Sequence, residues 1–361
     1  MARSHDSANP SARPRLLCVM QLPPPVHGAS TMNQIVADSE AIAARFDRSV
    51  IALRFADSVA DIGRPSLGKL VRAVGVGIRL ADHLVRRRPD LVYLTLSRDG
   101  GAFYRDCFYV ALVKLARRPL VFHLHMQPPE TTSWLHRWVF TNAHVIVLAR
   151  ALAPGAASRS VSVVANGIAD HARARTRPEG PPRVLFLSHL SVAKGPLLLL
   201  EALAVLASRG VPFRATLAGA DAGCLPQVAA RVRELGLDAL VDYVGPAYDE
   251  AKHALFASHD LVVLPSSNEA FPLVVLEAMM WGLPVVATQV GALAEIVADG
   301  ETGTLVPAGE THALATALEA YLGDPALRAT HGARGRARFV ERFTRARFEA
   351  DLVEALSRCL A

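Results

Sequence analysis

Short apolar runs alternate with longer amphipathic stretches along most of the chain. The runs are rich in Val, Ile and Leu, as buried parallel strands are, and the stretches between them have helical spacing. The strand candidates are Leu16–Met20, Val50–Leu53, Leu91–Leu96, Leu120–Leu124, Val145–Leu148, Val161–Val164, Val184–Ser188, Arg214–Ala218, Leu240–Val244, Leu261–Leu264, Val285–Ala287 and Thr304–Val306. The helix candidates are Leu67–Arg87, Phe103–Ala116, Pro196–Ser208, Gln227–Leu235, Leu273–Trp281, Thr311–Leu322 and Thr344–Leu360. This alternation predicts an α/β protein with parallel sheets.

A polar segment at residues 170–182, rich in Arg, Pro and Gly, divides the pattern into two halves and predicts a linker. A chain of 361 residues is long enough for two domains. We therefore expect a disordered tail over residues 1–14, an N-terminal domain over 15–169 and a C-terminal domain over 183–343. Each domain would be a doubly wound sheet, with a ligand cleft between the carboxyl ends of the two sheets.

The composition favours a folded protein of a reducing compartment. Hydrophobic residues make up 51% of the chain and charged residues 20%, which is enough apolar material for large cores. The four cysteines stand far apart, which argues against a disulfide framework and against a zinc cluster. The N-terminus lacks the apolar segment of a signal peptide, and no apolar run is long enough to span a membrane. We expect a cytoplasmic protein.

Positive charge is concentrated in the first half. Residues 1–182 hold 24 Lys and Arg against 13 Asp and Glu, a balance of +11, and the remainder holds 15 against 20, a balance of −5. This asymmetry predicts an anionic partner for the first half, either a phosphate-bearing substrate or an anionic membrane surface. The amphipathic stretch at residues 67–88 is the candidate for peripheral membrane contact; the alternative is a helix with solvated arginines. We expect no nucleic-acid partner, because no zinc-finger or RRM-type signature occurs.

The stretch from Ser266 to Gly291 carries the clearest candidate chemistry. A strand ends before it, and an apolar helix begins near Pro272, so the free amides of Leu273 and Val274 would form an anion site. Glu269 lies in the loop before this helix and Glu277 lies inside it, among apolar neighbours. A carboxylate in such a helix is costly unless a partner hydrogen-bonds it, which a neighbouring backbone or arginine could do.

This stretch resembles the donor-binding signature of the retaining glycosyltransferases of family 4, in glycosyltransferase group 1. The matching positions are Glu269, Glu277, Gly282, Pro284, Val285, Val286, Ala287 and Gly291. The resemblance implies the GT-B fold, in which two Rossmann-like domains face a cleft and the second domain binds a nucleotide-diphosphate sugar. It also implies that the last helix, over residues 344–361, packs back on the first domain.

A second segment of the same kind is Ser188–Gly195, which follows a strand and opens a helix. It resembles the family's phosphate-contacting G-R-L-x-x-x-K-G, with Lys194 at the position of the family's lysine. The family's arginine position is occupied by His189, a departure that weakens the expected diphosphate clamp.

The first half carries sparser matches. Val163–Asp170 resembles the element that ends the family's first domain, and Gly28 resembles the family's glycine loop, where the backbone approaches the donor without a Cβ. His123 and His125 alternate onto one face of a strand end, and His125 aligns best with a histidine of the family's reaction centre. On the residues alone, both histidines could equally be packing groups at a strand end.

The resemblance implies a glycosyltransferase that moves a sugar from a nucleotide-diphosphate donor to a glycan, lipid-linked or small-molecule acceptor with retention of configuration. The implied catalytic residues are Glu269, Lys194 and His125, and the implied substrate-binding residues are Gly28, His189, Phe271, Pro272, Leu273, Val274 and Glu277. Neither a metal nor a cofactor is expected, since no D-x-D motif occurs. Two alternatives stay open, namely a non-catalytic subunit with the same fold and another GT-B enzyme, such as a nucleotide-sugar epimerase or an inverting transferase.

Overall fold

The structure is a computed structural model that describes residues 13–55, 67–126, 133–153 and 158–360. The tail expected at residues 1–14 therefore lies outside the described residues up to residue 12. The chain forms two compact units, which are considered separately. Unit 1 comprises the residues up to Val147, Ala153–Val164 and those from Glu349 onward, and unit 2 comprises Leu148–Leu152 and Ala165–Phe348.

Unit 1 is built on a six-stranded parallel sheet with strand order β2-β1-β3-β4-β5-β6. Its strands are β1 (Arg15–Met20), β2 (Asp47–Ala52), β3 (Leu91–Thr95), β4 (Leu120–Leu124), β5 (His144–Val147) and β6 (Ser160–Val163). Its helices include α1 (Gly28–Asp38), α2 (Glu40–Arg45), α3 (Leu67–Asp82), α4 (Gly100–Leu115) and α5 (Trp134–Phe140). Strands β3 and β4 are almost wholly buried, as their continuous apolar runs predict.

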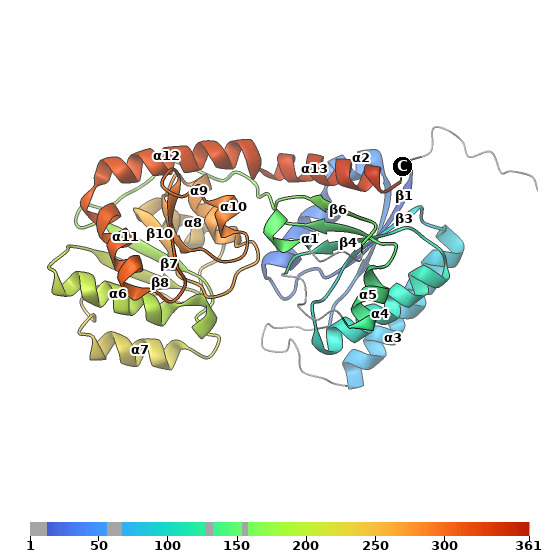
Figure 1. Ribbon diagram of the computed structural model, residues 1–361, viewed down its shortest axis with the longest axis horizontal. Coiled ribbons are helices and arrows are strands. Elements are labelled where there is room, and N and C mark those ends of the chain that lie inside the picture. The colour runs from blue at the N-terminus through green and yellow to red at the C-terminus, as the bar shows by residue number, and fades with distance from the viewer. Residues whose placement is uncertain (1–12, 56–66, 127–132, 154–157, 361) are drawn as a thin grey trace, which may run out of the picture. The chain divides into compact units, whose positions relative to one another are not determined.

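Unit 2 holds a second six-stranded parallel sheet, ordered β12-β11-β10-β7-β8-β9. Its strands are β7 (Arg183–Leu187), β8 (Arg214–Ala218), β9 (Val241–Tyr243), β10 (Leu261–Leu264), β11 (Val285–Thr288) and β12 (Gly303–Val306). Its helices are α6 (Pro196–Ser208), α7 (Leu225–Glu234), α8 (Asp249–Ser258), α9 (Leu273–Met280), α10 (Leu293–Ile296), α11 (Thr311–Gly323) and α12 (Pro325–Arg342). Helix α6 packs with α7 and α11, α9 packs with α12, and the sheet lies between these groups (Figure 1).

These two sheets confirm the predicted α/β class, and every predicted strand is present with its ends displaced by at most three residues. The helices differ more. The stretch expected as one helix at residues 67–87 is α3 followed by a π-helical turn at His83–Arg87, and the last helix, α13, spans Arg345–Arg358. Helices α2, α5, α8, α10 and α12 were not expected from the sequence.

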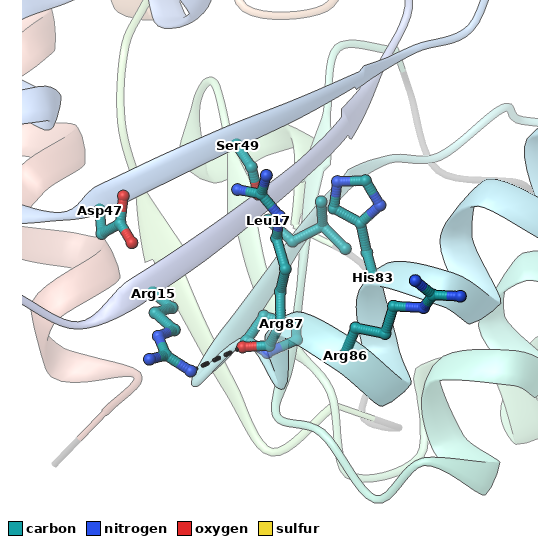
Figure 2. Close-up of a pocket in the computed structure, with 8 residues that line it drawn as sticks. Arg15, Leu17, Asp47, Ser49, His83, Arg86 and Arg87 are labelled. Carbon is teal, nitrogen blue, oxygen red and sulfur yellow. Dashed lines mark hydrogen bonds between the residues drawn. The ribbon is translucent and has the colours of Figure 1, made fainter. Parts of the chain in front are cut away.

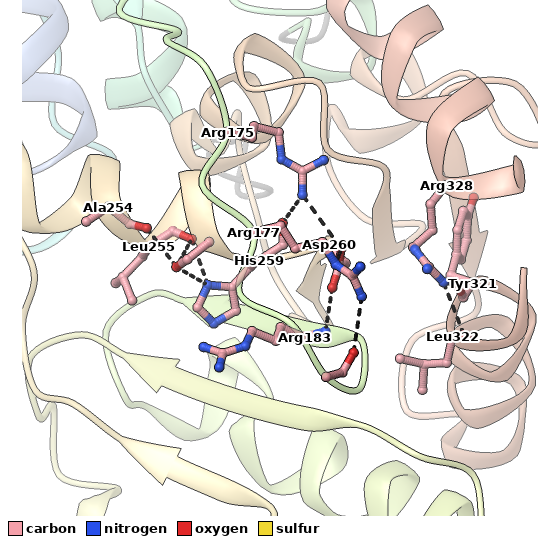
Figure 3. A network of polar contacts seen from close by, with 12 residues as sticks. Arg175, Arg177, Arg183, Ala254, Leu255, His259, Asp260, Tyr321, Leu322 and Arg328 are labelled. Carbon is pink, nitrogen blue, oxygen red and sulfur yellow. Dashed lines mark hydrogen bonds and ion pairs between the residues drawn. The ribbon is translucent and has the colours of Figure 1, made fainter. Parts of the chain in front are cut away.

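The segment at residues 170–182 contains no helix or strand and is bound along unit 2 (Figure 3). Its anchor is Asp260, a buried carboxylate whose Oδ1 lies 2.7 Å from Nε of Arg177 and whose Oδ2 accepts a 2.8 Å hydrogen bond from the Arg183 amide. The amide of Thr176 donates to the carbonyl of Ala257 at 3.1 Å. A buried carboxylate needs such partners, and here they fix the course of the segment.

Within the described ranges, no helix has both the length and the apolar character to cross a membrane.

Candidate functional site

In both sheets, the order in which successive strands are added reverses next to the first strand of the sheet. In unit 2 the chain proceeds from β7 to β8 and β9 on one side, and later from β10 to β12 on the other. In unit 1 the reversal lies between β1 and β3. Such a switch point leaves a crevice at the carboxyl ends of the two strands, where ligands of open α/β sheets bind. The loops after β7 and β10, and those after β1, β3 and β4, are therefore the candidate site segments.

Two glycines bring the unit 2 loops together. Gly195, with φ +74°, ends the 3-10 turn Val192–Lys194, and a Cβ there would lie 2.1 Å from the carbonyl oxygen of Pro265. Gly291, with φ +55°, would place a Cβ 1.8 Å from the carbonyl oxygen of Glu269. Only glycine allows both the left-handed backbone and these contacts. The loop after β10 is thus held between the loop after β7 and the loop after β11.

This packing places Lys194 beside Glu269. The ammonium Nζ lies 2.7 Å from Oε1 of the carboxylate, and the hydroxyl of Ser266 donates to the same oxygen at 2.8 Å. Glu269 is buried, and Lys194 remains partly exposed. A buried carboxylate needs such partners, so the pair holds Lys194 at the switch point.

Glu277 has a lysine partner of its own. Its Oε1 lies 2.5 Å from Nζ of Lys252, which comes from α8. Both side chains are partly exposed, and the contact with Lys252 uses one carboxylate oxygen. The sequence left a neighbouring backbone group or an arginine as possible partners, and the structure shows this lysine.

Helix α9 begins at Leu273, and Pro272 is its N-cap residue rather than part of its first turn. No side chain caps this end, so the amides of Leu273 and Val274 have no partner within the helix and form the positive end of its dipole. Phe271 is buried and packs edge-to-face on Phe343, with ring centroids 6.2 Å apart, so only its main chain is available to a ligand.

His189 follows β7 in the crevice loop. The amide of Leu190 donates to the carbonyl of Ala220 at 2.9 Å, which fixes the backbone beside it. Burial lowers the pKa of His189, and the charge of Lys194 lowers it further. In the absence of an anion, this histidine is therefore held toward its neutral form.

In unit 1 the predicted histidines do share one face. The rings of His123 and His125 have centroids 4.2 Å apart, and the hydroxyl of Tyr93 lies 2.6 Å from Nδ1 of His123. His27 caps α1 through its Nδ1, which accepts from the Ser30 amide, and Gly28 is the exposed first residue of that helix.

His125 differs from every charged group of the unit 2 site. Both of its ring nitrogens are buried and have no hydrogen-bond partner among the described residues. Burial lowers its pKa to about 3, with a further contribution from the nearby His27. The imidazole is therefore neutral near pH 7.

The structure thus groups Lys194, Glu269 and the loop of His189 at one switch point, with α9 and Glu277 beside them in unit 2. It groups His123, His125 and His27 in unit 1. Sequence reasoning missed Lys252, because it lies on another helix, 25 residues away from Glu277 in the sequence.

Sequence reasoning also missed a buried ion pair in unit 1, formed by Arg105 and Asp106 at 2.7 Å. The Ser97 amide donates to Asp106 at 2.8 Å, just after β3. Two adjacent charges in the otherwise apolar run of α4 are the signal that could have found it. Among the described residues, no three His, Cys, Asp or Glu side chains gather as a metal site.

Two doubly wound parallel sheets, each with its candidate residues at a switch point, define a protein of the GT-B fold class. Residues 168–338, a little under half of the chain, match the family model described as Glycosyl transferases group 1.

Relatives and solved structures are consistent with this match. The chain is similar to a D-inositol 3-phosphate glycosyltransferase of Arthrobacter sp. (strain FB24), with 38% identity over 43% of this chain and 38% of that protein. A protein of the same description from Corynebacterium diphtheriae is 33% identical over 58% of this chain and 50% of that protein. The structure of Anabaena HepE in complex with UDP has 25% identity and a TM-score of 0.73, and covers 95% of this chain and 100% of that one. The chain spans between 34% and 50% of the length of the curated relatives it matches.

Proposed function

We propose that the protein transfers a sugar from a nucleoside diphosphate to an acceptor hydroxyl, with retention of configuration at the anomeric carbon. The observation that carries the proposal is the switch point of unit 2, where Lys194 and Glu269 are paired beside the uncapped start of α9. A fixed cation and free amides suit a diphosphate, whose charge grows as it leaves.

In this proposal unit 2 binds the donor. Lys194, with the amides of Leu273 and Val274, stabilises the leaving diphosphate. Glu269, held beside Lys194 at the switch point, binds hydroxyls of the donor sugar. Glu277 accepts hydrogen bonds from the ribose hydroxyls, which agrees with its partly exposed carboxylate.

Unit 1 supplies the acceptor side. Gly28 begins α1 without a side chain, and a ligand there would meet exposed backbone. The unpartnered nitrogens of His125 suit a neutral hydrogen-bonding role toward sugar or acceptor hydroxyls.

The reaction breaks the bond between the anomeric carbon and the phosphate oxygen and forms a bond from the same carbon to the acceptor oxygen. The electron pair of the broken bond stays with the diphosphate, and the acceptor hydroxyl loses its proton to the departing diphosphate. The proposal includes no metal and no cofactor, since Lys194 and the α9 amides carry the compensating charge.

The names of the similar proteins suggest the first ligands to test. HepE binds UDP, so uridine diphosphate sugars are tested first, and inositol 3-phosphate joins glycans and lipid-linked saccharides as an acceptor. The proposal also includes a cytoplasmic location, with peripheral contact at the inner face of a membrane and no nucleic-acid partner.

The test begins with thermal unfolding of the whole chain against a panel of nucleotide sugars. A ligand at 100 times its Kd adds about 2.7 kcal/mol to the unfolding free energy. The stabilising donor is then incubated with the acceptor panel, and the product is examined by anomeric NMR. Transfer with the donor's configuration supports the proposal. Inversion, epimerised donor, or binding without transfer to any acceptor would overturn it in favour of an inverting transferase, an epimerase or a non-catalytic subunit.

A further inference from the structure

Helix α3 presents a row of apolar side chains to solvent. The members of the row are each 51–77% exposed; they are Leu67, Leu70, Val71, Val74 and Ile78. On a helix that turns by about 100° per residue, they fall within an arc of about 100°. The opposite side of α3, with Val76 and Leu80, is buried in unit 1. The helix therefore has two apolar sides. One is buried in unit 1, and the other faces solvent.

Helix α4 extends this row. It lies beside α3 (Figure 1), and the Tyr109 hydroxyl donates to the Ala73 carbonyl at 3.1 Å. The ring of Phe108 fills the space above Gly77, where a Cβ would lie 2.5 Å from it. Tyr104, Phe108 and Leu115 of α4 are exposed. We call these three residues and the row of α3 the apolar surface. Single exposed apolar residues are ordinary, but eight of them on two adjacent helices mark an interaction site.

Basic groups border the apolar surface. Residues 67–88 hold six Lys and Arg against one Asp. Arg72 and Arg79 lie next to the apolar row around the axis of α3. Arg86, Arg87 and Arg88 lie at the C-terminal end of the stretch. Arg86 and Arg87, with Arg15 and His83, line a cavity of about 250 Å³ (Figure 2), and Asp47 is the one acidic side chain in that lining.

We infer that the apolar surface docks unit 1 on an anionic membrane. An apolar helix face bordered by arginines lies in the interfacial plane of a bilayer, with its aliphatic side chains among the lipids and its guanidinium groups at the phosphates. Arginine suits this contact because its planar guanidinium pairs with two phosphate oxygens. The cavity at the end of α3 has room for a headgroup phosphate. The inference rests on the membrane contact that the proposed function includes, but its test is separate, because vesicle binding requires neither donor nor transfer.

The test is co-sedimentation of the full chain with phosphatidylcholine vesicles, with and without phosphatidylglycerol, at low salt. Two double variants are compared, V71E with I78E and R72Q with R79Q. The matched control is V340E, at an exposed apolar residue of α12 in unit 2. The unfolding temperature of each variant shows whether it remains folded, which is expected because all the changed side chains are exposed.

The wild type and V340E should bind the anionic vesicles much more strongly than the neutral ones. V71E with I78E should lose about tenfold or more in binding, and each arginine replaced should cost about fivefold. Equal binding to both vesicle types, or wild-type binding by a folded V71E with I78E variant, would overturn the inference. A dimer of the wild type that this variant abolishes, without any vesicle binding, would show that the surface joins two copies instead.

Discussion

The carboxyl ends of the strands carry different chemical groups in the two units. In unit 2 the two carboxylates each have a lysine partner, Lys194 for Glu269 and Lys252 for Glu277. In unit 1 the corresponding edge holds neutral imidazoles, and His125 has no hydrogen-bond partner among the described residues. Paired charges in fixed loops are preorganised for a charged ligand. A buried neutral group such as His125 is suited to hydrogen bonds with the hydroxyls of a ligand.

The two units also differ in charge and in exposed apolar residues. Unit 1 has 21 Lys and Arg against 14 Asp and Glu, a balance of +7, and unit 2 has 18 against 19, a balance of −1. Unit 1 exposes the apolar surface and its arginines, whereas the cationic groups of the unit 2 site are already paired within that unit. This difference fits the proposed function, in which unit 2 recognises the donor and unit 1 recognises the acceptor.

The largest effect is expected from a substitution that disrupts the loop packing of unit 2. Gly291→Ala would force a Cβ against the carbonyl oxygen of Glu269, whereas Gly300→Ala has a similar φ of +71° and open space. Both variants suffer the left-handed penalty of about 1–2 kcal/mol, and Gly291→Ala adds an overpacking cost of about 1–3 kcal/mol.

Thermal unfolding and nucleotide binding are measured on both glycine variants. Gly291→Ala should be the less stable and should lose binding, and Gly300→Ala should bind normally. Equal behaviour of the two would mean that the contact with Glu269 is not required for the site.

The next effect separates the two lysines. Lys194→Met removes the cation proposed to face the leaving diphosphate and should lower kcat about 10²–10³-fold. Lys252→Met disturbs only the partner of Glu277 and should weaken donor binding about tenfold with little change in kcat. Steady-state kinetics in saturating acceptor measures both. A similar loss of kcat in the two variants would remove the distinction between them.

The third effect concerns acid stability and belongs to unit 1. His125 has a folded pKa of about 3 and an unfolded pKa near 6.5, so the unfolded chain binds more protons as the pH falls below 6.5. Stability is therefore present above pH 6.5 and is lost progressively as the pH falls toward 3. Between pH 7 and 5 this loss is about 2 kcal/mol for His125.

Urea unfolding at pH 7 and 5 measures this loss, with His125→Gln as the comparison. The variant should be less sensitive to acid than the wild type by that amount. An unchanged difference between the two pH values would show that His125 is not held neutral by burial.

The smallest effect is the pH dependence of donor binding through His189. Burial and Lys194 lower the pKa of the free protein's imidazole, and a bound diphosphate raises it. Affinity should therefore fall as the pH rises from about 6 to 8, through the interval between the free and bound pKa values.

Calorimetric titration across this pH range compares three proteins. His189→Arg should bind with a flatter profile, because arginine stays charged, and His189→Ala should bind more weakly and with little pH dependence. If His189→Ala matches the wild type in affinity and in profile, His189 takes no part in the clamp.

The sequence predicted the strands and the unit 2 loops well, because both are local features. The apolar runs predict β3, β4 and β10, and the glutamates and glycines of the unit 2 site follow one another within the stretch from Ser266 to Gly291. The partner of Glu277 could not be predicted, since Lys252 lies on another helix, 25 residues away in the sequence. The same holds for Asp260, whose partners Arg177 and Arg183 come from a segment that the sequence identifies only as polar.

The exposure of α3 was beyond the sequence for a different reason. Its hydrophobic spacing is that of any amphipathic helix, and such spacing does not tell which apolar side faces the sheet. Only the structure shows that Val76 and Leu80 are buried, while the row from Leu67 to Ile78 faces solvent.

The most direct test of the central claim is calorimetric titration of uridine diphosphate, and then of other nucleoside diphosphates, into the wild type and Glu277→Gln. The control is Glu250→Gln on α8, whose exposed ion pair with Arg173 contributes little. Wild type and control should bind one nucleoside diphosphate equally, and Glu277→Gln should lose about 1.5–3 kcal/mol of binding while its unfolding temperature stays unchanged. Undiminished binding by a folded Glu277→Gln, or no binding of any nucleoside diphosphate by the wild type, would contradict the assignment of unit 2 as the donor site.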